Sequence, residues 1–205
     1  MTLTAEEIEE NYNKVRSLCS NLGERSVHAL NLVESLGERF ALCPASGKKD
    51  YHNAFPGGLI DHSLRVLGNA IQLKKTFGWK IPKESLIISC LFHDLGKVGD
   101  HVDDYYVNAE DWQQKRGELY GYNKKMQYMS VPHRSVFLCQ HYGLTLTQDE
   151  FLAILLNDGF VIDENKPYCL KEPVLAHVVM TADYLSTRQE KNVEFESTLW
   201  LNHTY

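Results

Sequence analysis

The chain has 205 residues, of which 43% are hydrophobic and 23% are charged. These values are close to those of globular domains, and they argue against a disordered tail protein and a coiled coil. Acidic residues outnumber basic ones by 27 to 21, which gives a formal net charge of -6. An acidic protein lacks the broad basic surface that non-specific binding of a long nucleic-acid duplex requires. The length favours one domain that spans residues 1–205.

The cysteine pattern and the amino-terminal segment predict a cytoplasmic protein. The chain has five cysteines, and no two of them have the CxxC spacing. An odd number without that spacing argues against a disulfide scaffold and a zinc ribbon. The first residues are acidic and lack the apolar run of a signal peptide. The most apolar short run, residues 86–92, is far too short to cross a bilayer, so we expect no membrane partner.

The spacing of apolar residues predicts a mostly helical chain. Two amino-terminal helices are expected within residues 5–42. The first begins at a capping box formed by Thr4 and Glu7, and the second ends before Pro44. A polar loop then leads into a third helix that ends at Gly78.

The second half of the chain continues this pattern with one exception. Pro82 opens a fourth helix that ends near Gly96. Residues 117–131 alternate in character and are rich in tyrosine, which predicts a small β-hairpin. Three later helices are expected to begin at Pro132, Thr147 and Pro173. The predicted fold is therefore an all-α helical bundle with a small β-hairpin insertion near residues 117–131.

The segment SCLFHDLGK places a histidine and an aspartate at the end of a strongly apolar helix. Burial of the Asp94 carboxylate beside the His93 imidazole is costly unless a partner compensates, and a divalent cation is one such partner. Imidazole nitrogen and carboxylate oxygen together suit Zn, Mn, Fe, Co or Ni. The alternative is a helix end, in which His93 interacts with the helix dipole and Asp94 pairs with Lys97.

Two further residues favour the metal. His62 lies near the inner face of the third predicted helix, in GGLIDHSLRV, and Asp183 lies in an apolar part of the last helix, in MTADYLS. Each residue alone would more often be a hydrogen-bonded core residue. Together with His93 and Asp94 they offer two nitrogens and two oxygens from three helices, and facing helices of a bundle commonly build metal sites.

The order GGLxxHS, HDxGK and ADxLS resembles that of the HD-domain metal-dependent phosphohydrolase superfamily. The resemblance covers about residues 51–188, the core of the predicted domain. It is similar to single HD domains of bacterial and phage proteins and to the HD domain of 3′–5′ exoribonucleases. It implies an all-helical core that binds a divalent metal, which would be Mn, Mg, Co, Ni, Zn or Fe. The ligands that it implies are His62, His93, Asp94 and Asp183.

Many members of this superfamily bind a second metal through two further histidines. His133, in VPHRSV, matches the position of the first. The second position falls at the helix end LLNDG, where Asn157 and Asp158 stand, and Asp158 would supply an oxygen ligand. The alternative for Asp158 is a plain helix end at Gly159. A one-metal site is therefore slightly favoured over a complete two-metal site.

The resemblance also suggests residues for catalysis and substrate binding. Asp94 would bind the metal and orient a water. Lys97 would neutralise a phosphate oxygen, unless it is a surface lysine paired with the helix end. His52, in DYHNAFPGG, would contact a phosphate or act as a general acid, unless it is a turn histidine with a local hydrogen bond. The candidate substrate-binding residues are Arg65, Arg134 and Tyr120.

These features predict a metal-dependent phosphatase or phosphodiesterase that acts on a nucleotide or a short single-stranded oligonucleotide through a metal-activated water. Tyrosines near the expected cleft would stack on a base, although aromatic residues more often fill core positions. Two alternatives stay open: an HD-type diiron oxygenase, which needs the fuller ligand set, and a non-catalytic nucleotide-binding module. A homodimer is compatible with the resemblance.

Overall fold

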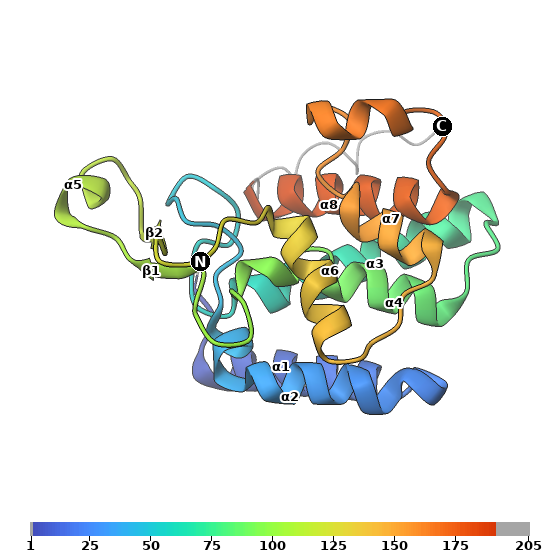
Figure 1. Ribbon diagram of the computed structural model, residues 1–205, viewed down its shortest axis with the longest axis horizontal. Helices are drawn as coiled ribbons and strands as arrows, with labels where there is room; N and C mark the ends of the chain where they lie inside the picture. Colours follow the sequence, from blue (N-terminus) through green and yellow to red (C-terminus); the bar gives the residue numbers. More distant parts are fainter. Residues whose placement is uncertain (1, 192–205) are drawn as a thin grey trace, which may run out of the picture.

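In the computed structural model, which describes residues 2–191, helices form the body of the protein and a two-stranded ribbon extends from one side (Figure 1). The α-helices are α1 (Ala5–Cys19), α2 (Ser26–Leu42), α3 (Gly58–Phe77), α4 (Lys83–Phe92), α5 (Asp111–Gln114), α6 (Val131–His141), α7 (Gln148–Leu155) and α8 (Val174–Lys191). Short 3-10 helices and strands complete the order: η1 (Gly23–Arg25), η2 (Leu95–Lys97), η3 (Asp163–Tyr168), β1 (Tyr106–Asn108) and β2 (Tyr120–Tyr122). The predicted all-α bundle is confirmed.

The helix ends follow the local signals in the sequence. Thr4 caps α1 in a complete capping box, and Thr147 forms the same arrangement before α7. Gly78 ends α3 in the left-handed conformation, at a φ of 67°, which glycine adopts without steric cost. Pro82 stands immediately before α4. These ends were predicted because caps and prolines act through neighbouring residues alone.

The predicted β-hairpin is present, but one of its strands was misplaced. β2 lies within the predicted segment 117–131 and pairs in antiparallel register with β1, so that Tyr106 faces Tyr122. The segment 125–131, which was expected to supply the second strand, forms no strand. The tyrosine rings of the two strands pack against one another, with centroids 5.8 Å apart for Tyr106 and Tyr120. This packing favours the pairing with the earlier segment over a tight local hairpin.

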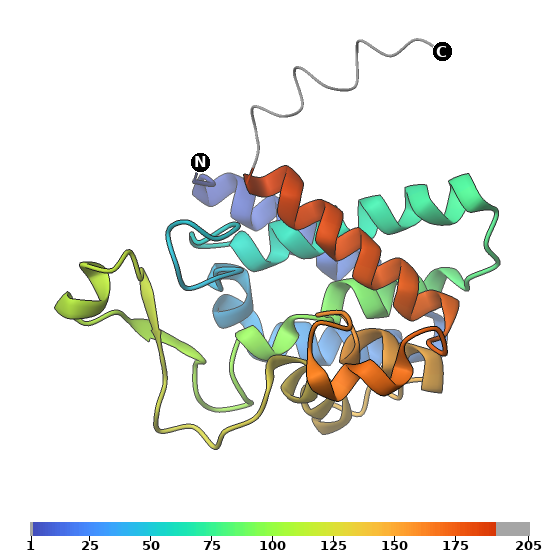
Figure 2. The ribbon, with the colours of Figure 1, turned by 90° about the horizontal axis from the view of Figure 1, so that it is seen from above.

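The bundle surrounds α4, whose residues from Ser85 to Phe92 are all buried. A helix that is apolar on every side requires neighbours on every side. α3 packs against both α4 and α8, α7 packs against α4 and α8, and α6 packs against α7 and η2. Figure 2 shows α8 lying across α3. The residues that follow α4 therefore enter the interior of the bundle.

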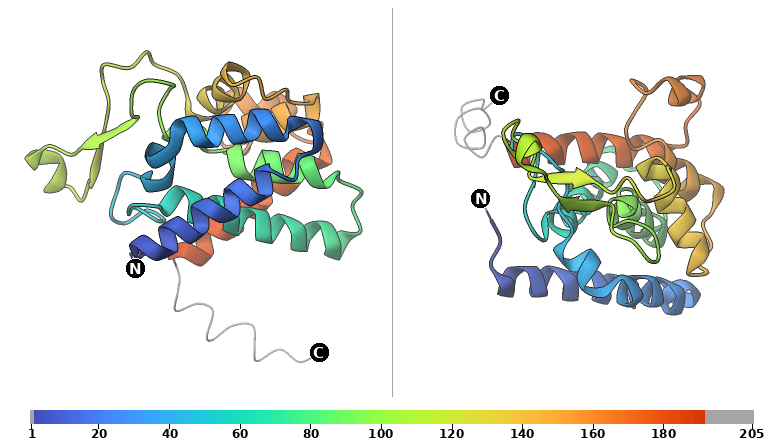
Figure 3. Two further views of the ribbon diagram at one scale, coloured as in Figure 1. Left: turned by 90° about the horizontal axis from the view of Figure 1, so that it is seen from below. Right: turned by 60° about the vertical axis from the view of Figure 1, so that its left-hand side comes forward.

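The amino-terminal helices cover the bundle from the side opposite α8. α1 packs against α2, and both contact α3 (Figure 3). The five cysteines are free thiols, and Cys169 alone among them is exposed, which agrees with the prediction against a disulfide scaffold. Within residues 2–191, every helix is too short or too polar to span a bilayer.

Candidate metal centre

Four side chains from three parts of the bundle converge on one buried point. His62 lies on α3 and Asp183 on α8, whereas His93 and Asp94 follow the last residue of α4. Both imidazoles are fully buried, and the side chains of Asp94 and Asp183 are 7% and 18% exposed. The structure thus brings together the four residues that the sequence predicted as ligands. Their role as ligands stays a prediction.

The end of α4 allows two adjacent residues to face the same point. His93 is the last residue with helical backbone angles, and Asp94 leaves the helix at φ -107° and ψ 10°. In a continuous helix the two side chains would point about 100° apart. The hydroxyl of Ser135 fixes this break, because it donates to the carbonyl of His93 at 3.0 Å and accepts from the amide of Gly96 at 2.8 Å.

The polar atoms of the cluster face one another at short distances. Nε2 of His62 lies 3.0 Å from Oδ1 of Asp183 and 3.8 Å from Oδ2 of Asp94. Nε2 of His93 lies 3.5 Å from Oδ2 of Asp94 and 3.9 Å from Oδ1 of Asp183. Ligand atoms at about 2.0–2.2 Å from a metal lie about 3–4 Å from each other, so these separations suit one cation.

Nε2 of His93 is buried without a hydrogen-bond partner within the described residues, and this supports the same interpretation. Nε2 of His62 is equally buried and faces Oδ1 of Asp183 at 3.0 Å. Nδ1 of His93 donates to the carbonyl of Cys90 at 2.9 Å. In the neutral ring Nε2 therefore presents a lone pair to the two carboxylates. An unpartnered buried nitrogen costs about 1–3 kcal/mol, which a cation would offset. The residues fit a divalent metal ion.

The charges of the cluster reflect carboxylates buried beside imidazoles. Burial lowers the pKa of His62, but the carboxylates of Asp183 and Glu190 raise it to about 10. Burial raises the pKa of Asp94, whereas Lys97 and the neighbouring imidazoles hold it well below its usual range. Without a metal, a proton on His62 therefore supplies positive charge to the cluster. A divalent cation would replace that proton.

The comparison with known proteins agrees with this geometry. The chain matches the family model of the HD domain over residues 59–188, which contain all four residues of the cluster. The chain belongs to the HD domain family. HD domains are generally metal-dependent hydrolases, and the cluster is a candidate metal site of that type. No curated protein and no solved structure matches the chain.

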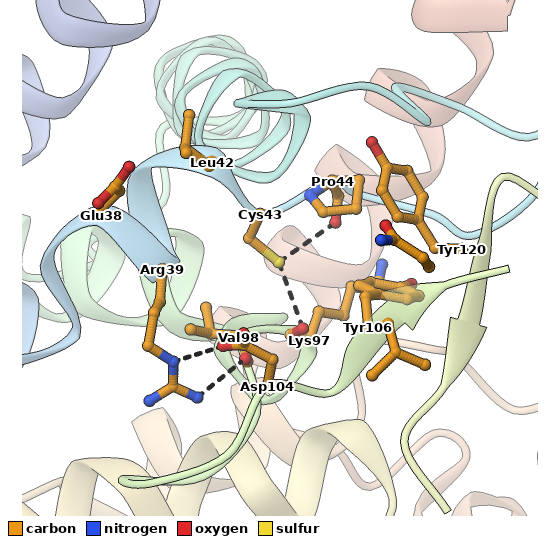
Figure 4. A pocket seen from close by; sticks show the side chains of 12 residues that line it. Glu38, Arg39, Leu42, Cys43, Pro44, Lys97, Val98, Asp104, Tyr106 and Tyr120 are labelled. Atoms are coloured by element: carbon orange, nitrogen blue, oxygen red, sulfur yellow. Dashed lines mark hydrogen bonds and ion pairs between the residues drawn. The ribbon is translucent and has the colours of Figure 1, made fainter.

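Lys97 connects the cluster of this HD domain with a cleft at the surface. Its Nζ lies 2.5 Å from Oδ2 of Asp94. Burial lowers the pKa of this ammonium group, but Asp94 raises it above its usual value. Lys97 also lines a cleft of about 570 Å³, which has Tyr106 and Tyr120 on one side and Arg39 on the other (Figure 4). A partly buried, charged ammonium group beside the cluster suits an anionic substrate.

His52 lies against the cluster, but its protonation state differs from that of the predicted general acid. Its ring stacks on that of His62, and its Nε2 is buried without a hydrogen-bond partner. Burial lowers the pKa of His52 to about 3, and the positive charges of His62 and Lys97 act in the same direction. The imidazole is therefore neutral near pH 7. This argues against the predicted general acid, and contact of His52 with a phosphate stays a prediction.

The residues predicted for a second metal lie in a separate cleft of this HD domain. His133 and Asp158 both line a cleft of about 680 Å³ beside α6. Nδ1 of His133 contacts Oγ of Ser130 at 2.6 Å. Burial raises the pKa of Asp158, which is near enough to the cluster to interact with the charge of Asp94. Among the described residues, the compact groups of possible metal-binding side chains are His52 with His62 and Glu190, and His62 with His93 and Asp183. A second metal at His133 and Asp158 therefore stays a prediction.

The three predicted substrate-binding residues occupy different surroundings in the HD domain. Tyr120 is half-buried in the cleft beside Lys97. Arg134 is only 3% exposed and donates to the carbonyls of Gly96 and Met129, at 3.2 and 3.0 Å. These contacts indicate that Arg134 stabilises the backbone after α4 and does not face a substrate. The physical reason is that a buried guanidinium needs acceptors for its donors, and these two carbonyls supply them.

Arg65 differs from Arg134 because its side chain is 40% exposed. It nevertheless has two acidic neighbours, with Nε 3.4 Å from Oε1 of Glu190 and one terminal nitrogen 3.5 Å from Oδ2 of Asp61. Contact with a substrate stays a prediction for Arg65. Its present partners show that it also neutralises acidic groups beside His62.

Glu190 is the residue at this centre that the sequence analysis missed. Its side chain is 1% exposed, and its two carboxylate oxygens lie 3.0 and 3.1 Å from Nδ1 of His62. A signal was present, since Glu190 follows Asp183 by seven residues and two turns of a helix return to the same face. The last helix was expected to end near residue 190, so Glu190 was not placed on its inner face.

Proposed function

We propose that this HD domain hydrolyses phosphate esters of nucleotides or short single-stranded oligonucleotides in a metal-dependent reaction. One observation carries the proposal. Two buried imidazole nitrogens, on His62 and His93, face two carboxylates, and the ammonium group of Lys97 is held 2.5 Å from one of those carboxylates, on Asp94. A site for a divalent cation with a fixed positive charge beside it suits the transfer of a phosphoryl group.

The roles of the residues follow from their positions. His62, His93, Asp94 and Asp183 would hold the cation. When bound, a divalent cation stabilises negative charge on a phosphoryl oxygen and lowers the pKa of a water. Lys97 would neutralise a second phosphoryl oxygen, because its ammonium group stays charged beside Asp94.

His52 would contribute a hydrogen bond to the substrate. Its Nε2 is buried and has no partner within the described residues. Because the ring is neutral near pH 7, it carries one proton on one of its two nitrogens. It can therefore donate to a phosphoryl oxygen or accept from a water without a change in charge.

The cleft that Lys97 lines and the cleft that Asp158 lines support a substrate with an organic part as large as a nucleoside. The cleft beside Lys97 has the phenol rings of Tyr106 and Tyr120 in its wall. The cleft that contains Asp158 is larger and is lined by Tyr128 and Phe137. Aromatic walls of this kind stack on bases without strong sequence preference. The cleft volumes fall in the range of small-molecule binding sites.

Release of phosphate from a panel of substrates tests the proposal. The panel holds ribo- and deoxynucleoside mono- and triphosphates, cyclic nucleotides and short oligonucleotides, each with Mn, Mg, Co, Ni or Zn. We expect metal-dependent turnover of at least one nucleotide class by the wild type. Asp94→Asn should lower that turnover by at least about 100-fold, because it removes a charged ligand.

The control variant is Asp163→Asn, whose carboxylate pairs with Lys166 at the surface and is 83% exposed. It removes one acidic charge at the exposed surface and should keep wild-type activity. If folded wild-type protein releases phosphate from none of these substrates with any of the metals, the proposed function is wrong.

A further inference from the structure

Glu190 is a fully buried carboxylate outside the part of the chain that matches the HD domain model, which ends at residue 188. It lies near the end of α8, and its side chain is 1% exposed. Burial of a carboxylate requires strong partners, and Glu190 has two. One is Nδ1 of His62, at 3.0 and 3.1 Å from its two oxygens, and the other is Nε of Arg65 at 3.4 Å.

We propose that Glu190 is a positioning residue, which sets the orientation and tautomer of the metal ligand His62. A carboxylate only accepts hydrogen bonds, so Nδ1 of His62 must carry a proton. Once a metal displaces the second proton, the lone pair of the ring lies on Nε2, the atom that faces Asp183 and Asp94. A ligand fixed in this way binds a metal without the free-energy cost of ring rotation or a change of tautomer.

The geometry separates this role from that of a fifth metal ligand. Nδ1 and Nε2 lie on different edges of one imidazole ring, and both oxygens of Glu190 are on the Nδ1 edge. The carboxylate of Asp183 is on the Nε2 edge, 3.0 Å away. Glu190 therefore acts on the metal position through His62.

Arg65 extends the arrangement to the loop that carries His52. Oδ2 of Asp61 is 3.5 Å from Arg65 and accepts a hydrogen bond from Nδ2 of Asn53 at 2.9 Å. Asn53 has a φ of 43°, a left-handed conformation that asparagine tolerates better than most residues. His52 precedes it and stacks on His62. One chain of polar contacts, from Glu190 to Asn53, therefore holds both imidazoles.

The test measures metal binding by calorimetry in the full chain, with Mn²⁺ and without substrate. Glu190→Ala should lower the affinity by about 10–100-fold, the range expected when a partner of a metal-binding histidine is lost. Glu190→Gln keeps the size and one acceptor oxygen but loses the charge. Its affinity for Mn²⁺ should therefore lie between those of the wild type and Glu190→Ala. This second variant keeps the experiment decisive if the alanine variant does not fold.

A matched control is present just before α8. Glu172 also contacts a histidine, with Oε1 3.6 Å from Nδ1 of His177, and its side chain is 11% exposed. Glu172→Gln removes a similar contact away from the cluster and should leave Mn²⁺ affinity unchanged. If Glu190→Gln and Glu190→Ala bind Mn²⁺ as tightly as this control does, Glu190 has no positioning role.

A second readout addresses the tautomer directly. In protein labelled with ¹⁵N-histidine and loaded with Zn²⁺, the wild type should show His62 with a protonated Nδ1. Glu190→Ala should lose or broaden that signal, which a general loss of stability would not change in folded protein. A persistent, sharp Nδ1–H signal in the folded variant would overturn the inference.

The inference rests on the metal site of the proposed function and is independent of the substrate. If the wild type binds Mn²⁺ with the expected loss in the Glu190 variants but hydrolyses no phosphate ester, the positioning role is supported and the proposed hydrolysis is wrong. If the wild type binds no divalent metal, both are wrong.

Discussion

The imidazole of His52 lies parallel to that of His62, with ring centroids 4.7 Å apart and planes inclined by 9°. This stacking places a neutral ring against a ring that is charged in the metal-free protein, because the pKa of His52 is lowered to about 3 and that of His62 is raised to about 10. The two histidines therefore have different roles. His62 faces two carboxylates through Nε2, and His52 has a buried Nε2 without a hydrogen-bond partner among the described residues.

The first prediction concerns the contribution of His52 to turnover. We expect His52→Gln to lower kcat/KM for phosphate release by about 10- to 100-fold, the scale of one hydrogen bond that strengthens in the transition state. The affinity for Mn²⁺ should stay within about 2-fold of the wild type, since His52 holds no metal. Because the wild-type ring is neutral above about pH 3, the pH–rate profile between pH 5 and 8 should keep its shape. A lost limb of the profile in the variant would show that His52 titrates during catalysis.

The second prediction concerns the stability of the metal-free protein. The pKa of His62 is raised in the folded state, to about 10, above the value of about 6.5 in an unfolded chain. The folded protein therefore holds this proton more strongly. The stabilisation is complete below pH 6.5 and is lost as the pH rises towards 10. Urea unfolding in EDTA should thus show a free energy of unfolding that falls across this window, by an amount on the order of a few kcal/mol.

His62→Gln is the control for that experiment, because it removes the titrating group and keeps a polar side chain. Lysine, tyrosine and cysteine groups also titrate near pH 9–10, so the comparison between the two proteins isolates the contribution of His62. If the free energy of unfolding changes equally with pH in both proteins, the titration of His62 is not the cause of that change.

The third prediction concerns the protons released when a metal binds. A cation can use Nε2 of His62 only after the proton there has left. We therefore expect about one proton to be released per Mn²⁺ bound at pH 7, and the affinity to rise with pH below 10. Calorimetry in two buffers with different enthalpies of ionisation measures the number released. Binding without proton release, at an affinity that does not change between pH 6 and 8, would exclude His62 as the ligand that exchanges a proton for the metal.

The helices could be predicted because their signals are local. Thr4 and Thr147 cap helices through residues three positions away, and Gly78 ends α3 by its own backbone conformation. The cluster could also be predicted, because a buried histidine–aspartate pair at the end of α4 requires a partner that offsets the cost of burial. The apolar run around it shows the burial, and the compact group of metal-binding residues follows from three helices that face inward.

The remaining features depend on contacts between distant parts of the chain. Glu190 meets His62 only because α3 and α8 pack side by side, 128 positions apart in the sequence. β2 pairs with β1 across the intervening α5, and no local turn signal in the sequence indicates this pairing. Arg134 was predicted to bind the substrate, but packing buries it against the loop after α4. Charge states such as that of His52 also follow from burial in the folded protein.

The last prediction concerns the close approach of α6 to the residues that follow α4. A Cβ on Gly96 would overlap the carbonyl oxygen of Val131 and crowd Arg134, so no side chain fits there. Gly96→Ala should force these backbones apart, lower the free energy of unfolding by about 1–3 kcal/mol, and weaken Mn²⁺ binding because Asp94 lies two residues away. Gly68→Ala, within α3, meets nothing within 4 Å and should be neutral or stabilising by up to about 1 kcal/mol. Urea unfolding of both variants measures the difference, and equal stabilities would show that α6 does not hold the end of α4 in place.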